Sequence, residues 1–394
     1  MRIDLKTAIE LTSEEVQDVF LMFRDIGDDP LRVQESFRGM FPKKIAEAMG
    51  ELRALRRRAA QKFQMGRDMY CTKPLLEQAS SEPVANHRAQ RFAEAGLTVV
   101  HDPCCGMGSD SIALARAGLK VKASDKNDVA VEFARANAEI YRVSSSIEFT
   151  AADITTDPPG KGAIFLDPAR RRGARRIMNP EDWSPNPETV SRLIQGRGAA
   201  CVKLSPATDL ERLFELFPMP DEIEFISYRG EAKECVFWYG KVASKNERRA
   251  TMLPDGAFYA GQADPQAPVG ELSNWIFDPD PALVRAGLLG AFAKEHGLCV
   301  LDPAIGYLTG PKDIDSPFLR GFRVIAQETL DPKKMRVMLR EHKVGRLLVR
   351  KRGIAERPQT LEARFLPKKF GDRQLTLLAM RLGERHIGVL AEED

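Results

Sequence analysis

The 394-residue chain has no long apolar run, few cysteines and no cysteine pair with metal-binding spacing. No stretch approaches the roughly 18 consecutive apolar residues that a membrane-spanning helix needs. The N-terminal sequence MRIDLKTAIELTSEE carries acids where a signal peptide has its apolar core. The six cysteines include no C-x-x-C motif, so neither a disulfide framework nor a zinc site is expected. We therefore expect a cytoplasmic protein with no membrane segment and no bound metal.

The overall composition is that of a globular enzyme and excludes a disordered or fibrous chain. Hydrophobic residues make up 43% of the sequence and charged residues 29%. A chain of 394 residues has room for two or three domains, each with its own core. The formal net charge is only +3, so the clustering of Lys and Arg says more about partners than their total does.

The segment from Val99 to Asp125, VVHDPCCGMGSDSIALARAGLKVKASD, predicts the first strand–helix–strand unit of an α/β, doubly wound sheet. An apolar strand ends at Asp102 and is followed by a turn with Gly106 and Gly108, a helix, and a second strand that ends at Asp125. In such units small residues let the backbone approach a ligand, and the helix N-terminus faces an anion. The alternative is a tight turn that binds nothing.

The turn is not a NAD fingerprint, because no third glycine follows Gly108 at the required offset. The string D-x-C-x-G-x-G instead resembles motif I of class I S-adenosylmethionine (SAM) methyltransferases, with Cys104 where a glycine is commoner. The resemblance implies that this turn, including Asp102, Cys104, Gly106 and Gly108, holds SAM. Asp125 is placed to accept hydrogen bonds from both ribose hydroxyls of the cofactor.

The resemblance extends to the next strand. In class I methyltransferases an acid after the third strand bonds the adenine amino group, and the next apolar residue packs on the ring. Asp153 and Ile154 fit these positions by spacing. We add Lys126, which follows Asp125, to the residues expected at the cofactor.

The fourth strand predicts the position of the catalytic carboxylate. Ala163 to Leu166 is apolar and is followed by Asp167, which is placed to orient the substrate or accept a proton and also to contact the cofactor. The competing motif Asp157-Pro158-Pro159 mimics the D-P-P-Y/W signature of amino-group methyltransferases but precedes this strand. The tetrapeptide DPAR lacks the second proline and the aromatic residue of that signature.

Lys203 is the second catalytic candidate, near the end of the predicted fifth strand, AACVKLS. A lysine in a central strand is costly unless it reaches a cleft or a carboxylate. With Asp167 and Glu234 it is similar to the K-D-K-E tetrad of ribose 2′-O-methyltransferases, in which a lysine takes a hydroxyl proton, and Lys73 is then the first member. Chance matching of abundant Lys and Glu residues is the alternative.

Five arginines follow Asp167 with no acid among them. Their position just past the carboxyl edge of the sheet is where α/β enzymes bind ligands. Guanidinium groups there suit phosphate or an RNA backbone, and a surface loop without a ligand is the alternative. The predicted substrate-binding residues are Arg170, Arg171, Arg172, Arg175 and Arg176.

Basic residues gather in two further places, and each is either a phosphate-contact surface or a solvated face. The first is a predicted helix over residues 42–67 and the second lies near the C-terminus. Their basic residues are Lys43, Lys44, Arg53, Arg56, Arg57, Arg58, Lys62 and Arg67 in the first, and Lys343, Arg346, Arg350, Lys351 and Arg352 in the second.

From about residue 50 to 390 the chain resembles bacterial and archaeal methyltransferases with a C-terminal THUMP-like domain. The resemblance rests on the strings MYCTKPLLEQASSEP, DPARRR, WIFDPDPALVRAGLLGAF and CVLDPAIGYLTG. It implies a Rossmann-like, seven-stranded methyltransferase domain (67–245) between an N-terminal helical domain (1–66) and a THUMP-like α/β domain (246–394). Thr72, Glu77 and Gln78 are candidate lid residues over the SAM pocket. In the last domain we expect one helix over Pro281 to Phe292. The string LDPA occurs at 166–169 and again at 301–304, and we expect its second occurrence to be a structural turn.

The resemblance implies a SAM-dependent methyltransferase acting on RNA, either tRNA or rRNA. Two other functions stay open. One is a SAM-fold RNA-binding protein without catalysis, and the other is a methyltransferase whose substrate is a small molecule or a protein.

Overall fold

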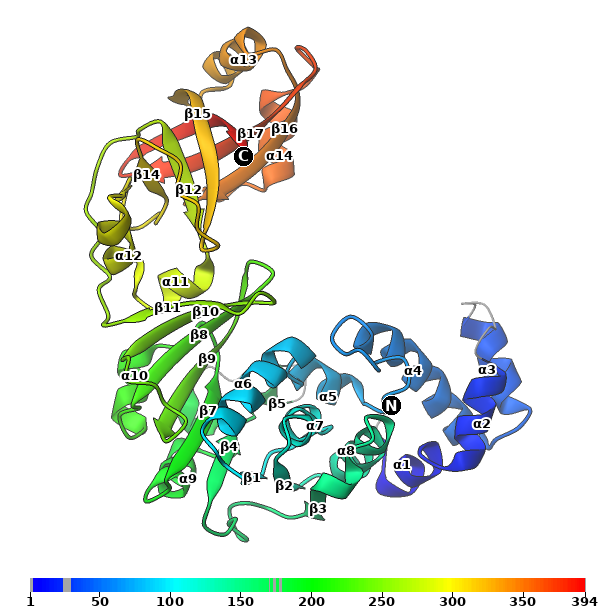
Figure 1. The fold of residues 1–394 in the computed structure, drawn as a ribbon. Coiled ribbons are helices and arrows are strands. Elements are labelled where there is room, and N and C mark those ends of the chain that lie inside the picture. The colour runs from blue at the N-terminus through cyan, green and yellow to red at the C-terminus, as the bar shows by residue number, and fades with distance from the viewer. Residues whose placement is uncertain (1–2, 24–29, 170, 173–174, 177–178, 394) are drawn as a thin grey trace. The chain divides into compact units, whose positions relative to one another are not determined.

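The computed structural model describes residues 3–23, 30–169, 171–172, 175–176 and 179–393 (Figure 1). The chain divides into two compact units, residues 1–223 with 234–245, and residues 224–233 with 246–394. No helix in the described ranges is long and apolar enough to cross a membrane.

Four helices of the described residues begin the first unit, and a side chain caps the start of each of the first two. The side chain of Asp4 accepts a hydrogen bond from the N–H of Thr7, and that of Ser13 from the N–H of Val16, so each satisfies a free amide at a helix start. The helices are α1 (Leu5–Leu11), α2 (Glu14–Met22), α3 (Pro30–Arg38) and α4 (Lys43–Ala59).

The N-terminal helices share their hydrophobic core with the residues that follow. Buried side chains of α1 to α4 form one cluster with Tyr70, Met107 and Phe133. Met107 lies inside the predicted cofactor turn. The N-terminal helices therefore support that turn directly.

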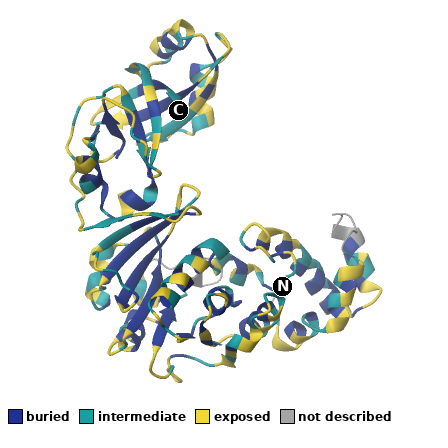
Figure 2. Ribbon diagram, viewed as in Figure 1, coloured by how far each residue is buried: buried dark blue, intermediate teal, exposed yellow. Residues whose placement is uncertain are grey.

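A nine-stranded sheet carries the predicted site, with the order β11-β10-β8-β9-β7-β4-β1-β2-β3. The strands β3, β2, β1, β4 and β7 are parallel, and β9 runs antiparallel to β7. The central strands β4 and β7 are buried along their whole length, as parallel strands covered on both faces are (Figure 2). The strand bounds are β1 (Val99–Asp102), β2 (Lys120–Asp125), β3 (Ile147–Ala151), β4 (Ala163–Leu166), β7 (Ala199–Leu204), β8 (Glu222–Tyr228), β9 (Glu231–Gly240), β10 (Arg248–Leu253) and β11 (Ala257–Gly261).

The predicted doubly wound sheet is confirmed, and its strand number is larger than predicted. The strands β3, β2, β1, β4, β7, β9 and β8 account for the predicted number of seven, and β10 and β11 extend the sheet beyond β8. Sequence patterns did not reveal this extension, because β10 lies in the segment that we assigned to the C-terminal domain (246–394).

Helices lie on both faces of this sheet (Figure 1). The helices α6, α7 and α8 lie on one face, and α9 and α10 lie on the other. The short α5 precedes α6 in the chain. The bounds are α5 (Lys73–Gln78), α6 (Glu82–Glu94), α7 (Ser109–Arg116), α8 (Asp128–Ile140), α9 (Pro187–Ile194) and α10 (Leu210–Leu216).

The second unit contains a seven-stranded sheet with the order β13-β14-β12-β15-β18-β17-β16. Leu377 and Leu378 of β17 belong to different hydrophobic clusters, so the sheet buries apolar side chains on both faces. The bounds are β12 (Trp275–Pro279), β13 (Cys299–Val300), β14 (Leu308–Gly310), β15 (Leu319–Thr329), β16 (Val344–Arg352), β17 (Arg373–Leu382), β18 (Arg385–Glu393), α11 (Pro281–Arg285), α12 (Leu289–His296), α13 (Pro332–Glu341) and α14 (Pro358–Phe365).

Two local expectations in this unit have different outcomes. The second LDPA is a structural turn: Asp302 accepts hydrogen bonds from the N–H groups of Ala304 (2.8 Å) and Gly383 (3.1 Å). The single helix over residues 281–292 is wrong, because the chain forms α11 and α12 instead. Gly287 between them has φ +70°, a left-handed conformation that ends a helix.

Gly66 and Gly50 form a matched pair for testing how the N-terminal helices pack. A Cβ at Gly66 would lie 2.3 Å from the carbonyl carbon of Ala59, whereas a Cβ at Gly50, inside α4, would meet nothing within 4 Å. We expect Gly66→Ala to lower the free energy of unfolding by about 1–3 kcal/mol. We expect Gly50→Ala to raise it by about 0.5–1 kcal/mol. Urea unfolding followed by circular dichroism measures both, and equal effects would contradict the packing.

Candidate active site

The turn after β1 depends on two glycines. Gly106 has φ +54° and Gly108 has φ +86°, both in the left-handed region. A Cβ at Gly108 would lie 3.1 Å from the Cβ of Ala134, so glycine lets α8 pack against the turn. A Cβ at Gly106 would meet nothing within 4 Å. The backbone at Gly106 is therefore open to a ligand.

Asp102 at the end of β1 is fully buried and incompletely paired. Its Oδ2 accepts a hydrogen bond from the Ser111 hydroxyl at 2.6 Å, whereas its Oδ1 has no partner within the described part of the chain. Burial, reinforced by the neighbouring charge of Asp110, raises the pKa of Asp102 to about 8. The raised pKa favours the protonated form of this carboxyl group.

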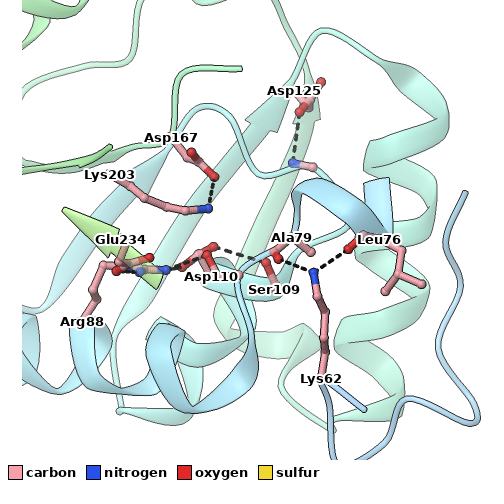
Figure 3. A network of polar contacts seen from close by, with 12 residues as sticks. Lys62, Leu76, Ala79, Arg88, Ser109, Asp110, Asp125, Asp167, Lys203 and Glu234 are labelled. Carbon is pink, nitrogen blue, oxygen red and sulfur yellow. Dashed lines mark hydrogen bonds and ion pairs between the residues drawn. The ribbon is translucent and has the colours of Figure 1, made fainter. Parts of the chain in front are cut away.

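Asp125 at the end of β2 is joined to the turn by a hydrogen bond (Figure 3). Its Oδ2 accepts from the N–H of Gly106 at 3.0 Å, and its Oδ1 accepts from the N–H of Asn127 at 2.9 Å. Burial raises its pKa, against these two hydrogen bonds, which lower it. Each carboxylate oxygen keeps a second lone pair, so the side chain is fixed in position and can still accept hydrogen bonds from a diol.

The remaining predicted cofactor residues, Cys104, Lys126, Asp153 and Ile154, have different surroundings. Lys126 is exposed, and its Nζ donates to the Ser184 hydroxyl at 2.7 Å. Asp153 accepts hydrogen bonds from the N–H and hydroxyl of Thr155, which lower its pKa. Ile154 is buried. Burial raises the pKa of the Cys104 thiol, so Cys104 is a small neutral turn residue.

Asn137, which sequence reasoning missed, holds the turn from behind. Its Nδ2 donates to the carbonyls of Met107 (2.9 Å) and Tyr70 (3.0 Å), and its Oδ1 accepts from the N–H of Tyr70 (2.7 Å). The side chain is fully buried in α8. A polar residue on the apolar face that includes Phe133 and Ala138 was the available signal, because a buried amide needs partners.

Asp167 and Lys203 meet at the carboxyl edge of the sheet. The register pairs Leu166 with Val202, which places the ends of β4 and β7 side by side. Lys203 Nζ donates to Asp167 Oδ2 at 2.6 Å, and the lysine side chain is 9% exposed against 21% for the aspartate. The lysine therefore reaches a carboxylate, as its place in a central strand requires.

A second buried cation, Arg88 of α6, lies beside this pair (Figure 3). Its guanidinium group forms ion pairs with Asp110 and Glu234 and donates to the Ser80 hydroxyl at 2.7 Å. The predicted first member of the tetrad, Lys73, is instead exposed in the first turn of α5. The cation that contacts Glu234 is Arg88, from the next helix, and the role of Lys73 stays a prediction.

Four of the five predicted arginines lie in a short hairpin. The strands β5 (Arg171–Arg172) and β6 (Arg175–Arg176) pair antiparallel, and Arg170 lies outside the described residues. At the base of the hairpin the N–H of Ala169 donates to the Ser184 carbonyl at 2.8 Å, and the N–H of Ser184 donates back at 3.1 Å. The hairpin is thus anchored two residues after Asp167, beside the Ser184 that Lys126 contacts.

Several other basic residues that could contact phosphate form hydrogen bonds or ion pairs inside the protein. Arg56 is buried and donates to the Met69 carbonyl at 3.0 Å. Lys62 donates to the carbonyls that end α5, Leu76 (2.8 Å) and Ala79 (3.0 Å) (Figure 3). In the second unit Arg350 and Arg352 pair with Asp278, and Lys351 donates to Ile354, whereas Lys343 and Arg346 are exposed.

The three candidate lid residues have local roles. Thr72 caps α5 by accepting from the N–H of Leu75 at 3.4 Å, Glu77 lies 3.6 Å from Arg58, and Gln78 is exposed. Among the described residues no three His, Cys, Asp or Glu side chains are grouped to hold a metal ion.

Two family models match the chain. Residues 97–207 match the family described as RNA cap guanine-N2 methyltransferase, and residues 319–393 match the family described as THUMP domain-like. The first match contains the turn, Asp125, Asp167 and Lys203, and the second lies within the second unit.

Known relatives cover most of the chain. An uncharacterised S-adenosylmethionine-dependent methyltransferase of Mycobacterium tuberculosis is 34% identical over 340 residues, covering 84% of this chain and 92% of the relative. A tRNA (uracil(54)-C(5))-methyltransferase of Pyrococcus abyssi is 29% identical over 135 residues, covering 32% of this chain and 31% of that protein. A crystal structure of a Porphyromonas gingivalis W83 protein named as a methyltransferase has TM-score 0.77 and 19% identity, with 100% of both chains covered. The last likeness shows a shared fold.

The raised pKa of Asp102 predicts a pH dependence of stability. In the folded chain Asp102 keeps its proton up to about pH 8, whereas in the unfolded chain the ordinary value is 3.8. Between these values the folded state binds the extra proton, so stability falls as pH rises. From pH 6 to pH 8 we expect the free energy of unfolding to fall by about 2 kcal/mol more in the wild type than in Asp102→Asn.

Urea unfolding at several pH values measures this difference. Asp157→Asn, which changes an exposed carboxylate, is the matched control and should follow the wild type. Parallel pH profiles for Asp102→Asn and the wild type would show that Asp102 is ionised in the fold.

Proposed function

The chain belongs to the S-adenosylmethionine-dependent methyltransferases, and on that premise we propose that it methylates a nucleotide of tRNA or rRNA. The observation that carries the proposal is the arginine hairpin anchored two residues after Asp167. In sequence, the four arginines of this hairpin follow Asp167, the carboxylate best placed to contact a methyl acceptor. A polyanionic substrate fits this arrangement better than a neutral small molecule does.

The turn and its neighbours fit SAM in chemistry and in space. The open backbone at Gly106 and the unpaired Oδ1 of Asp102 suit the amino-acid end of the cofactor, and Asp125 suits the ribose hydroxyls. By their place after β3, Asp153 and Ile154 would contact the adenine. Lys126 and Cys104 complete the proposed pocket. When bound, SAM supplies a methyl group on a positively charged sulfur.

Asp167 is proposed to contact the methyl acceptor, and Lys203 to hold Asp167. A carboxylate oxygen that accepts an N–H or O–H of the substrate orients the acceptor atom for in-line attack. The Lys203 ammonium donates its hydrogen bond to Asp167, so its role is to fix that carboxylate rather than to take up a proton.

The acceptor atom is proposed to be nitrogen or oxygen rather than carbon. The C5 carbon of uracil becomes nucleophilic only after a thiolate adds to the neighbouring ring carbon. Burial raises the pKa of Cys71, Cys104, Cys105 and Cys201, so these thiols stay protonated and unreactive. Cys235 is fully buried. The five cysteines of the first unit therefore offer no ready thiolate, which supports nitrogen or oxygen as the acceptor atom.

RNA binding has a second support in the second unit, whose C-terminal part matches the THUMP domain-like family. Exposed cations there include Lys343 and Arg346, at the start of the edge strand β16. Basic side chains on an edge strand suit a phosphate backbone.

The cofactor part of the proposal predicts that Asp125→Ala weakens SAM binding. The substitution removes the carboxylate that would accept hydrogen bonds from the ribose hydroxyls. It also leaves the N–H of Gly106 without its acceptor. We expect about a 10- to 100-fold rise in the SAM dissociation constant, measured by calorimetry. Asp157→Ala, which removes an exposed carboxylate, should bind SAM like the wild type. Unchanged SAM affinity in Asp125→Ala would place the cofactor elsewhere.

The RNA part is tested with total RNA from a strain that lacks the gene. We expect labelled methyl groups from SAM to enter tRNA or rRNA at one nucleoside, identified by mass spectrometry as N- or O-methylated. The quadruple change of Arg171, Arg172, Arg175 and Arg176 to alanine should weaken RNA binding at least 10-fold and reduce its salt dependence.

The matched control carries four alanines at the exposed residues Lys6, Lys122, Lys161 and Lys241 and should bind RNA nearly as the wild type does. RNA binding without any methyl transfer would favour a non-catalytic RNA-binding protein. Unchanged RNA affinity in the hairpin variant would favour a small-molecule or protein substrate.

A further inference from the structure

Lys203 lies among three carboxylates but forms its hydrogen bond with only one of them. Its Nζ is 2.6 Å from Asp167 Oδ2. Its positive charge also acts on Asp110, in the first turn of α7, and on Glu234, in β9. Burial raises the pKa of both groups and the charges of Arg88 and Lys203 lower it, so that the pKa of Asp110 is lowered on balance and that of Glu234 is raised. Asp110 and Glu234 are deeper than Asp167, with side chains 10% and 3% exposed. The question is therefore why the Lys203 ammonium group bonds to Asp167, the most exposed of the three carboxylates.

Arg88 supplies that reason, because it occupies both inner carboxylates. Its planar guanidinium group reaches Asp110 with one nitrogen and Glu234 with another, a geometry that a lysine does not offer. The Ser80 hydroxyl and the ring of Phe165 hold it from other sides. Burial by itself would lower the pKa of Arg88, but Asp110 and Glu234 together raise it, so the group keeps its charge.

The charge balance of this cluster depends on Arg88. Two cations, Arg88 and Lys203, serve three carboxylates. The two inner carboxylates, Asp110 and Glu234, share Arg88, and Asp167, which is closest to solvent, pairs with Lys203. A buried carboxylate without a cation is costlier than one that water reaches. Without Arg88, Lys203 would be the single cation available to two deep carboxylates, and its flexible side chain would turn inward.

We propose that Arg88 is a positioning residue that, by occupying Asp110 and Glu234, keeps the Lys203 ammonium on Asp167 at the carboxyl edge of the sheet. The importance of that edge for methyl transfer rests on the proposed function. The position of Lys203 itself does not depend on it.

The direct test is the crystal structure of the full-length Arg88→Met variant. We expect the Lys203 Nζ to leave Asp167 and to lie within hydrogen-bond distance of Asp110 or Glu234. The matched control is Arg91→Met, which removes a second arginine of α6 from a buried carboxylate, Glu222. Arg91→Met should leave the Lys203–Asp167 contact intact. A Lys203–Asp167 contact that persists in Arg88→Met would overturn the proposal.

The kinetic test uses labelled SAM and total RNA from the deletion strain. For Arg88→Met we expect kcat to fall at least 10-fold while the SAM dissociation constant changes less than threefold, because Arg88 pairs with Asp110 and Glu234 and not with a residue proposed to hold SAM. Arg91→Met should keep kcat within twofold even where its thermal midpoint falls. Equal losses of kcat in the two variants would show a structural role only. If the wild type methylates no RNA, the proposed function fails, and the crystallographic comparison still decides the role of Arg88.

A triple variant covers the case in which Arg88→Met does not fold. Arg88→Met with Asp110→Asn and Glu234→Gln removes the inner charges together with their cation. Since no inner carboxylate then competes for Lys203, its ammonium should return to Asp167. Loss of the Lys203–Asp167 contact in this variant would contradict the proposal.

Discussion

The parallel register of β2, β1, β4 and β7 is the constraint on which the site depends. Parallel strands end at the same edge of a sheet, so Asp125, Asp102, Asp167 and Lys203 come from four strands and meet in one place. A shift of one residue in any of these pairings would turn the end residues to the opposite face. The two glycines of the turn then keep the space in front of this edge open.

Burial decides what each acid at this edge can do. Asp102 is sealed in and holds a proton, whereas Asp167 stays partly exposed and is paired with Lys203. Asp110 and Glu234 are buried more deeply than Asp167 and depend on Arg88 for charge balance. Removing one member of a buried ion pair typically costs about 3–5 kcal/mol, so the network ties catalytic geometry to folding. The acidic residues at this edge thus have three different roles.

The N-terminal helices pack against the proposed cofactor site. Their core includes Met107, and Asn137 joins the Met107 carbonyl to Tyr70. Arg56, whose guanidinium lies 4.3 Å from the centre of the Phe20 ring and 4.9 Å from that of Tyr70, serves as a packing residue. The basic segment 42–67 could contact RNA by its charge, but some of its cations hold α5 and the turn instead.

The sequence by itself determined the features that depend on neighbours along the chain. The strand–turn–helix pattern, the acids at strand ends and the doubly wound order are written in consecutive residues, and the structure has them where they were expected. The arginine hairpin was visible as a run of charge. These features were predictable because local periodicity and turn chemistry act over a few residues.

Only the tertiary structure decided which side chains become partners. Arg88 and Glu234 are 146 residues apart, and Asn137 and Tyr70 are 67 apart, and nothing in either local pattern indicates the other. Arg88 therefore could not be predicted as the partner of Glu234. A buried polar group must find a partner wherever the fold places one, so the identity of that partner is a property of packing and not of the local sequence.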